Sequence, residues 1–237
     1  CVEFSVPETG FVQNRRNILQ QNFTTGSAKE TFQDAVIIDN DFKISQTFSK
    51  LLQNPDFKSQ VIEIIDYAID LYKSEYSNKY ANTDLCLYKK YTYEDICRLL
   101  NWDKGMVALN IGGYYYDKRT NTLPVFINYD KEEHISETIK YEDHFINPKI
   151  IVAMSKNNRR INDKSMEMFT KAAKRKTQIH LFVRKNKEDK GSKEFYYLGL
   201  IRIINIEQEY MTSKPICKIT YQLDKAVKRD IYDFIVN

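Results

Sequence analysis

The 237-residue sequence lacks long apolar runs, and no stretch approaches the roughly eighteen consecutive apolar residues that a membrane-spanning helix needs. It also lacks a positively charged start followed by an apolar segment, which is the pattern of a secretory signal peptide. The sequence therefore indicates neither a membrane span nor a leader. Because it begins at Cys1 rather than Met, we expect it to be part of a longer protein.

Cysteine is also scarce, and the four cysteines are far apart with no CxxC spacing. This argues against a disulfide framework or a zinc site, so we expect a reducing, cytoplasmic location and no cofactor or metal. The three histidines form no HExxH pair and begin no HxK motif. A GxxxxGK[ST] loop is missing as well. These absences exclude zinc-protease motifs, phospholipase-D-type nuclease motifs and ATP binding through that loop.

The composition, with 42% hydrophobic and 29% charged residues, is that of an ordinary folded protein of one large domain or one domain with a smaller attachment. The net charge of +4 says little about partners, but its distribution says more. Residues 156–193 contain thirteen Lys or Arg against four Asp or Glu. Such a run is typical of a nucleic-acid-binding surface, although a solvated charged face would produce it too.

Apolar periodicity divides the chain in two. Residues 1–90 are predicted to be a helical connector, because helical spacing dominates there. Residues 91–237 contain four predicted strands, at 123–129, 178–184, 195–206 and 216–223, with helices at 163–176 and 225–236. This order predicts an α+β fold with a curled mixed sheet or small barrel and flanking helices. Gly199 within a strand predicts a bulge or a close backbone approach.

Two groups of residues are candidates for reading a nucleic acid. Asp143 could accept a hydrogen bond from the N4 amino group of cytosine beside the stacking rings of Tyr116, Tyr129 and Tyr141. Polar and basic side chains could bind phosphates and base edges: Ser155, Lys156, Asn158, Arg159, Arg160, Lys174, Arg175 and Lys176. The alternatives are core packing for the tyrosines, a helix cap around Asp143 and a simple surface turn for residues 155–160.

Residues 195–203, Phe-Tyr-Tyr-Leu-Gly-Leu-Ile-Arg-Ile, resemble the signature strand of SET- and RING-associated (SRA, or YDG) domains, with Leu198 where that family usually has Asp. Residues 91–203 also resemble the C-terminal domain of SauUSI-type restriction enzymes, through segments 93–102, 123–129 and 141–143. The resemblance implies an SRA-like (PUA-like) fold that binds double-stranded DNA with methylated or hydroxymethylated cytosine. In SRA domains the modified base is flipped out between aromatic rings while an acid reads its Watson–Crick edge.

The resemblance further implies a parent chain with a phospholipase-D-like nuclease and a helicase-like motor. A non-catalytic recognition domain would direct that motor and nuclease to foreign DNA, in modification-dependent (type IV) restriction and antiphage defence. Two other interpretations stay open. The domain could instead be a protein–protein module that holds the parent enzyme together as a homodimer, or a divergent nuclease.

Overall fold

The computed structural model describes residues 36–38, 42–103, 113–130, 143–186, 193–211 and 213–237. The chain divides into two compact units. The first comprises residues 1–86 and 94–106, and the second comprises residues 87–93 and 107–237. The candidate base-reading and phosphate-binding residues all belong to the second unit.

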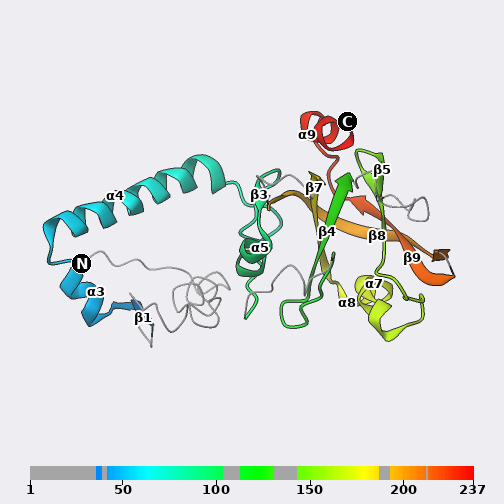
Figure 1. Cartoon of the computed structure of the whole chain (residues 1–237), viewed down its shortest axis with the longest axis horizontal. Coiled ribbons are helices and arrows are strands. Elements are labelled where there is room, and N and C mark those ends of the chain that lie inside the picture. Colours follow the sequence, from blue (N-terminus) through cyan, green and yellow to red (C-terminus); the bar gives the residue numbers. More distant parts are fainter. Residues whose placement is uncertain (1–35, 39–41, 104–112, 131–142, 187–192, 212) are drawn as a thin grey trace. The chain divides into compact units, whose positions relative to one another are not determined.

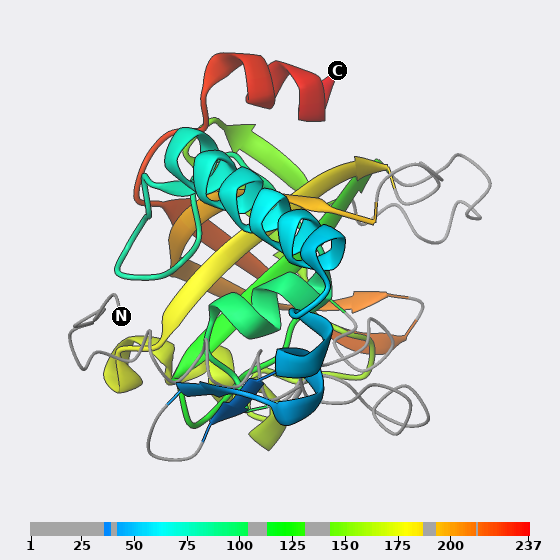
Figure 2. The same ribbon diagram turned by 90° about the vertical axis from the view of Figure 1, so that its left-hand side faces the viewer.

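The first unit contains a short hairpin, β1 (Val36–Ile38) and β2 (Phe42–Ile44), followed by α3 (Gln46–Leu51) and α4 (Pro55–Leu71). The Asn54 side chain caps α4 by accepting hydrogen bonds from the backbone of Asp56 and Phe57, which satisfies N–H groups that have no partner inside the helix. α4 is one continuous helix (Figure 2) and buries none of its residues. None of the helices in the described segments is both long and apolar enough to span a bilayer.

The second unit is built on a seven-stranded mixed sheet (Figure 1). Its strands are β3 (Lys90–Tyr91), β4 (Thr122–Asp130), β5 (His144–Asn147), β6 (Ile150–Met154), β7 (Gln178–Asn186), β8 (Phe195–Met211) and β9 (Lys214–Leu223). Six of them follow the order β4-β7-β8-β9-β6-β5, and β3 pairs with β8. Only β4 and β7 are parallel among these pairs, because a long connection containing β5 and β6 joins them.

Helices cover the ends of this sheet (Figure 1). The short helices α7 (Glu167–Thr170) and α8 (Ala172–Arg175) lie at one end, and α9 (Arg229–Val236) lies at the other. The helix α5 (Tyr93–Leu99) follows β3. The predicted α+β fold, a curled mixed sheet with flanking helices, is therefore confirmed.

The four predicted strands correspond to β4, β7, β8 and β9, whereas β3, β5 and β6 of the sheet have no predicted counterpart. The hairpin of β1 and β2 is also a correction, because it lies in the region predicted to be helical. β6 is a run of five apolar residues without alternation, so its sequence lacks the period-two signal of a half-exposed strand. The prediction of one continuous helix over residues 163–176 is wrong. The backbone leaves helical geometry at Lys171, and a 3-10 turn (Lys164–Met166), α7 and α8 take its place.

The main core lies on one face of the sheet. Every one of the six strands in the ordered path contributes to it, and so do the short helices and α9. Its members include Leu123, Ile127, Phe145, Ile151, Leu181, Val183, Leu198, Ile219, Tyr221, Met166, Phe169 and Ile235. The alternation predicted for β7 explains which of its residues lie on this face, since Leu181 and Val183 are fully buried within the core.

The opposite face of β7 carries a second, aromatic layer. The Phe182 ring stacks between Phe126 at 5.2 Å and Tyr197 at 5.0 Å between ring centroids. His180 is fully buried beside them, with its Nδ1 atom 2.9 Å from the Tyr197 hydroxyl. Burial lowers the pKa of His180 to about 3, so its imidazole is neutral at physiological pH.

Gly199 lies at a bulge between β7 and β8, as predicted. Leu181 pairs with Gly199 and the next residue, Phe182, pairs with Tyr197, so the register shifts by one residue between them. The backbone of Gly199 has φ of +103°, a conformation that side chains strongly disfavour. The bulge bends β8 and contributes to the curl of the sheet.

Candidate nucleic-acid interface

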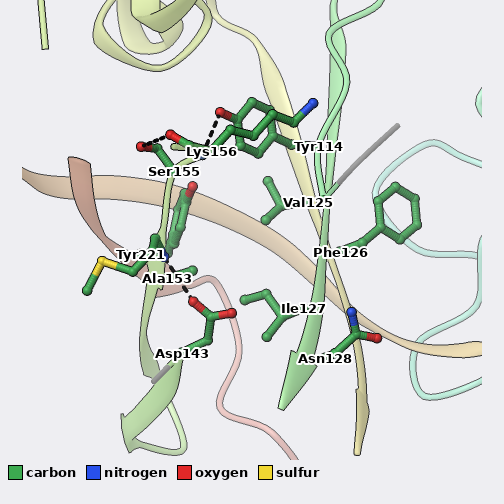
Figure 3. A pocket seen from close by; sticks show the side chains of 12 residues that line it. Tyr114, Val125, Phe126, Ile127, Asn128, Asp143, Ala153, Ser155, Lys156 and Tyr221 are labelled. Atoms are coloured by element: carbon green, nitrogen blue, oxygen red, sulfur yellow. Dashed lines mark hydrogen bonds between the residues drawn. The ribbon is translucent and has the colours of Figure 1, made fainter. Parts of the chain in front are cut away.

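A cavity of about 280 Å³ opens between β4 and β6 in the second unit (Figure 3). These two strands are separated by three others in the sheet order, yet residues of both line the cavity. The sheet must therefore curl until its ends approach each other. One wall is apolar, with Val125 and Ile127 of β4 pointing into the space, whereas the Phe126 ring points away from it.

Asp143 contributes the acid of this cavity. It immediately precedes β5, and its Oδ1 atom accepts a hydrogen bond from the backbone N–H of Met154 at 2.9 Å. That bond links the carboxylate to the end of β6, eleven residues further along the chain. Figure 3 shows the carboxylate between Ala153 and Ile127, so the group is held at the cavity rather than on an outer turn.

Two tyrosines, Tyr114 and Tyr221, also line the cavity. Burial raises the pKa of Tyr221 well above its usual value, and the neighbouring Tyr114 and Asp143 raise it further. Burial likewise raises the pKa of Tyr114. Both phenols therefore keep their protons at neutral pH, which leaves aromatic faces and hydroxyl groups without negative charge.

Lys156 supplies positive charge at the Tyr114 end of the cavity. Its Nζ atom stands 4.7 Å from the centre of the Tyr114 ring, and its backbone N–H donates to the Tyr114 hydroxyl at 3.2 Å. Burial and the nearby charge of Arg159 lower the pKa of Lys156. A partly desolvated ammonium next to a second cation is a favourable place for an anion such as phosphate.

Residues 155–160, which we call the basic loop, continue from β6 alongside β9. The Ser155 N–H donates to the Cys217 carbonyl at 2.8 Å, and the Ser155 hydroxyl accepts from the Cys217 N–H at 2.9 Å. Asn158 is exposed and takes a left-handed conformation with φ of +57°. Arg160 is exposed as well, and Arg159 is half-buried. The basic loop thus presents donors while its start is fixed on β9.

The predicted helical cations lie on α8 and at its end. Arg175 pairs with Glu167 at 3.0 Å, and Lys171 pairs with the same carboxylate at 2.7 Å. Hydrogen bonding from Lys171 and the charges of Lys171 and Arg175 lower the pKa of Glu167. Lys174 and Lys176 are exposed. The charge of this segment is therefore partly compensated.

The remaining predicted rings lie elsewhere. The Tyr116 hydroxyl hydrogen-bonds with Asn121 Oδ1 at 3.0 Å, and the Arg175 guanidinium stands 5.9 Å from the Tyr116 ring. Tyr129 packs against Phe145, with ring centroids 5.8 Å apart. Neither tyrosine lines the cavity. Tyr141 lies outside the described residues.

The pocket residues predicted from the sequence include neither Tyr114 nor Tyr221. Alternation along β9 places Cys217, Ile219 and Tyr221 on the core face. A buried tyrosine within such an apolar row needs a polar neighbour for its hydroxyl group. The occurrence of Tyr221 in this row is therefore the sequence signal for a polar site. Within the described residues, no cluster of His, Cys, Asp or Glu could hold a metal ion.

Comparison with known proteins places most of the chain in one family. The profile of "Domain of unknown function (DUF3427)" matches residues 85–235, and that of "Domain of unknown function (DUF8090)" matches residues 6–78. A search of curated proteins finds no match to the chain.

Several solved structures have a partly similar fold. The SRA domain of SUVH5 in complex with hemi-methylated CG DNA is 10% identical, with a TM-score of 0.42 over 64% of this chain and 96% of that one. KRYPTONITE in complex with mCHG DNA and SAH is 9% identical, with a TM-score of 0.45 over 93% and 45%. Arabidopsis thaliana SUVH6 with SAM is 12% identical, with a TM-score of 0.43 over 94% and 39%. These likenesses, at 9–12% identity, concern the fold alone.

Proposed function

Since the chain belongs to the DUF3427 family, whose description gives no activity, we propose a function from the cavity itself. The second unit is a non-catalytic domain that binds double-stranded DNA and reads methylated or hydroxymethylated cytosine. It takes the modified base, flipped out of the helix, into the cavity between β4 and β6. The observation that carries this proposal is that one space is lined by the Asp143 carboxylate, two tyrosine rings and Lys156.

Each group in the cavity suits one part of a modified cytosine. The N4 amino group of cytosine is a hydrogen-bond donor, and the Asp143 carboxylate is an acceptor that the Met154 N–H holds in place. The rings of Tyr114 and Tyr221 form part of the cavity wall and would contact the inserted base. The apolar side chains of Val125 and Ile127 suit the C5 methyl group.

The energies of these contacts balance the energy of flipping. Extrusion of a base costs a few kcal/mol in lost pairing and stacking. An aromatic face returns about 1–3 kcal/mol per stacked base, and a charge-assisted hydrogen bond to the carboxylate adds to that. The methyl group itself contributes only about 1–3 kcal/mol, and only in a closely fitting pocket. Selective binding therefore requires the rings, the acid and close enclosure together.

The basic loop would bind the DNA backbone beside the flipped base. Lys156 lines the cavity, and Arg159 is close enough to lower the pKa of Lys156. Phosphates on either side of a base in the cavity would therefore meet two cations. Asn158 and Arg160 extend this surface, and Lys174, Arg175 and Lys176 would bind more distant phosphates.

We further propose that this domain serves a SauUSI-type modification-dependent restriction enzyme. The support is the resemblance of segments 93–102, 123–129 and 141–143 to the recognition domain of that class. In that setting the domain would deliver the nuclease and motor of a parent chain to foreign DNA that carries modified cytosine, possessing no cleavage activity of its own.

The proposal can be tested with the whole chain and short duplexes that carry cytosine, 5-methylcytosine or 5-hydroxymethylcytosine at one position. We expect a gel shift at lower protein concentration with the modified duplexes. A 2-aminopurine beside the target base should brighten on binding, because its neighbour leaves the stack. Equal affinity for all duplexes would contradict base reading, and selective binding without brightening would contradict flipping.

The same duplexes, together with analytical ultracentrifugation and a cleavage assay, test the two competing functions. A protein–protein module would bind none of the duplexes and would instead show self-association in analytical ultracentrifugation. A divergent nuclease would shorten the duplexes in the presence of Mg²⁺. Either result would replace the proposed function.

A further inference from the structure

Gln208 of β8 is one of the side chains that hold the basic loop, together with Ser155 and Asp163. The Gln208 Oε1 atom accepts a hydrogen bond from the Ile161 N–H at 2.8 Å. Its Nε2 group donates to the Arg159 carbonyl at 3.3 Å. One amide therefore holds backbone groups on both sides of Arg160.

Gln208 also fastens this part of the loop to β9. Its Nε2 group donates to the Ile216 carbonyl at 2.7 Å, and the Arg159 N–H donates to the Pro215 carbonyl at 2.8 Å. The Cys217 thiol lies 3.6 Å from the Arg159 carbonyl. The Asp163 carboxylate also accepts a hydrogen bond from the Arg160 N–H at 2.7 Å. Backbone hydrogen bonds, this carboxylate and the Gln208 amide together fix the position from which the Arg159 side chain leaves the loop.

The Gln208 side chain belongs to neither the hydrophobic core nor the cavity that contains Asp143, and it is half-buried. Its side-chain amide bonds to backbone groups of residues 159, 161, 209 and 216. Removal of this side chain would therefore loosen the backbone around Arg159 and Ile161 without opening the core.

We propose that Gln208 is a positioning residue that sets the basic loop, and Arg159 in particular, for binding to a DNA phosphate. This inference rests on the proposed function, because it assumes that the loop binds DNA. A loop fixed before binding loses less conformational entropy when its side chains engage the backbone. Gln208 contributes to affinity for every duplex, whereas Asp143 contributes to the choice of base.

The test compares Gln208→Leu with Gln222→Leu in the whole chain. Gln222 is a suitable control because it is a glutamine of β9 in the same sheet, and its Oε1 atom accepts a hydrogen bond from Arg202 at 2.9 Å rather than from the basic loop. Affinity for methylated and unmethylated duplexes is measured over a series of salt concentrations. Hydrogen exchange at the Ile161 amide is measured without DNA.

We expect Gln208→Leu to weaken binding to both duplexes by roughly tenfold, equivalent to about 1.4 kcal/mol. The slope of log affinity against log salt should become shallower by about 0.9, as expected when the protein neutralises one phosphate fewer. The ratio of affinities for methylated and unmethylated DNA should stay the same, and the Ile161 amide should exchange faster. Gln222→Leu should match the wild type in all four measurements.

Wild-type affinity and slope in Gln208→Leu would overturn the positioning role while leaving the proposed function intact. Absence of selective binding by the wild type would instead reject the proposed function, and the positioning role with it. If Gln208→Leu does not fold, Gln208→Met decides, since it keeps the length and neutral charge of the side chain and loses every hydrogen bond of the amide. Should neither variant fold, the fold itself depends on Gln208 and the positioning role is rejected.

Discussion

The two faces of β7 illustrate two different uses of buried side chains. On one face, Leu181 and Val183 join the core that borders the cavity, where Asp143 and Lys156 bring opposite charges into the same space. On the other face, the Phe182 ring lies between aromatic neighbours and His180 is kept neutral by burial. The cavity face has charged groups beside a space, whereas the aromatic face is closely packed.

This difference predicts how substitutions divide between binding and stability. A change on the aromatic face should lower the free energy of unfolding and leave the choice of base unaltered. A change in the cavity should alter the choice of base and leave the free energy of unfolding nearly unchanged. The reason is that Asp143 and Lys156 lie beside a space and not within tightly packed side chains. Measurements of the free energy of unfolding and of the affinity for methylated and unmethylated DNA on the same variants test this division.

The largest effect is expected for Phe182→Ala on the aromatic face. Phe182 is fully buried, and its ring lies within 5.2 Å of two other rings. Removal of a buried phenylalanine leaves a cavity and typically lowers the free energy of unfolding by about 3–5 kcal/mol. Urea denaturation followed by fluorescence measures this decrease. Below the unfolding transition, the ratio of affinities for methylated and unmethylated DNA should equal that of the wild type, and an altered ratio would contradict the division.

The next effect concerns Asp143→Ala in the cavity. Without the carboxylate, the N4 amino group of an inserted cytosine loses a charge-assisted hydrogen bond, which is typically worth about 1.5–3 kcal/mol. Much of the preference for modified cytosine should disappear, while salt-sensitive binding to any duplex persists. Asp233→Ala is the control, because Asp233 pairs with Arg229 on α9. Preserved preference in Asp143→Ala, measured by competition gel shifts, would remove Asp143 from the proposed site.

A separate effect on the aromatic face, which depends on the pH chosen, is the pH dependence that His180 gives to stability. The folded pKa of about 3 lies below the ordinary value of 6.5, so the unfolded state binds the proton more readily between these values. The stabilising contribution is therefore complete above pH 6.5 and is lost as the pH falls toward 3. Within that window the free energy of unfolding should fall by about 1.4 kcal/mol per pH unit.

Carboxylates also titrate at low pH, so the contribution of His180 is the difference between the wild type and His180→Asn in parallel urea titrations. His144→Asn serves as the matched control, since His144 is exposed on β5. If His180→Asn retained the full slope of the wild type, the neutral, buried state of His180 would be contradicted.

The smallest effect is expected for the combined change of Lys174, Arg175 and Lys176 to Ala. Glu167 already compensates part of this charge through its pair with Arg175. Binding to modified and unmodified duplexes should weaken alike, and the slope of log affinity against log salt should fall by about 0.9 for each phosphate that the variant no longer neutralises. A slope equal to that of the wild type would show that α8 faces away from DNA.

Local patterns in the sequence predict four strands of the sheet but neither β3, β5 and β6 nor the cavity. The alternation of Ile179, Leu181 and Val183 is a local signal, and so is Gly199 within a strand; both predictions are confirmed. The cavity depends instead on the curl that brings β4 toward β6, which no local pattern encodes. The position of Asp143 likewise depends on a hydrogen bond to Met154 across a turn between two strands.

The tyrosines of the cavity also show what local sequence patterns cannot predict. Tyr114 and Tyr116 are two residues apart, and both are aromatic, so the sequence could not decide which of them borders the cavity. Tyr114 pairs with Val125 in an isolated bridge beside β4, whereas the Tyr116 hydroxyl bonds to Asn121 in the following turn. Tyr221 lines the cavity from a strand that is far away in sequence.

The pairing of β6 with β9 also determines the order in which the cavity can form during synthesis. Ile151 pairs with Tyr221, although seventy residues separate them in the sequence. Asp143 and the basic loop therefore leave the ribosome well before the strand that completes their wall. Until residues 214–223 have emerged and paired, the apolar residues of β6 have no neighbour on that side, and the nascent chain cannot hold a base. Such a distant pairing is expected to slow folding, and it restricts the proposed recognition of DNA to chains in which β9 has been added.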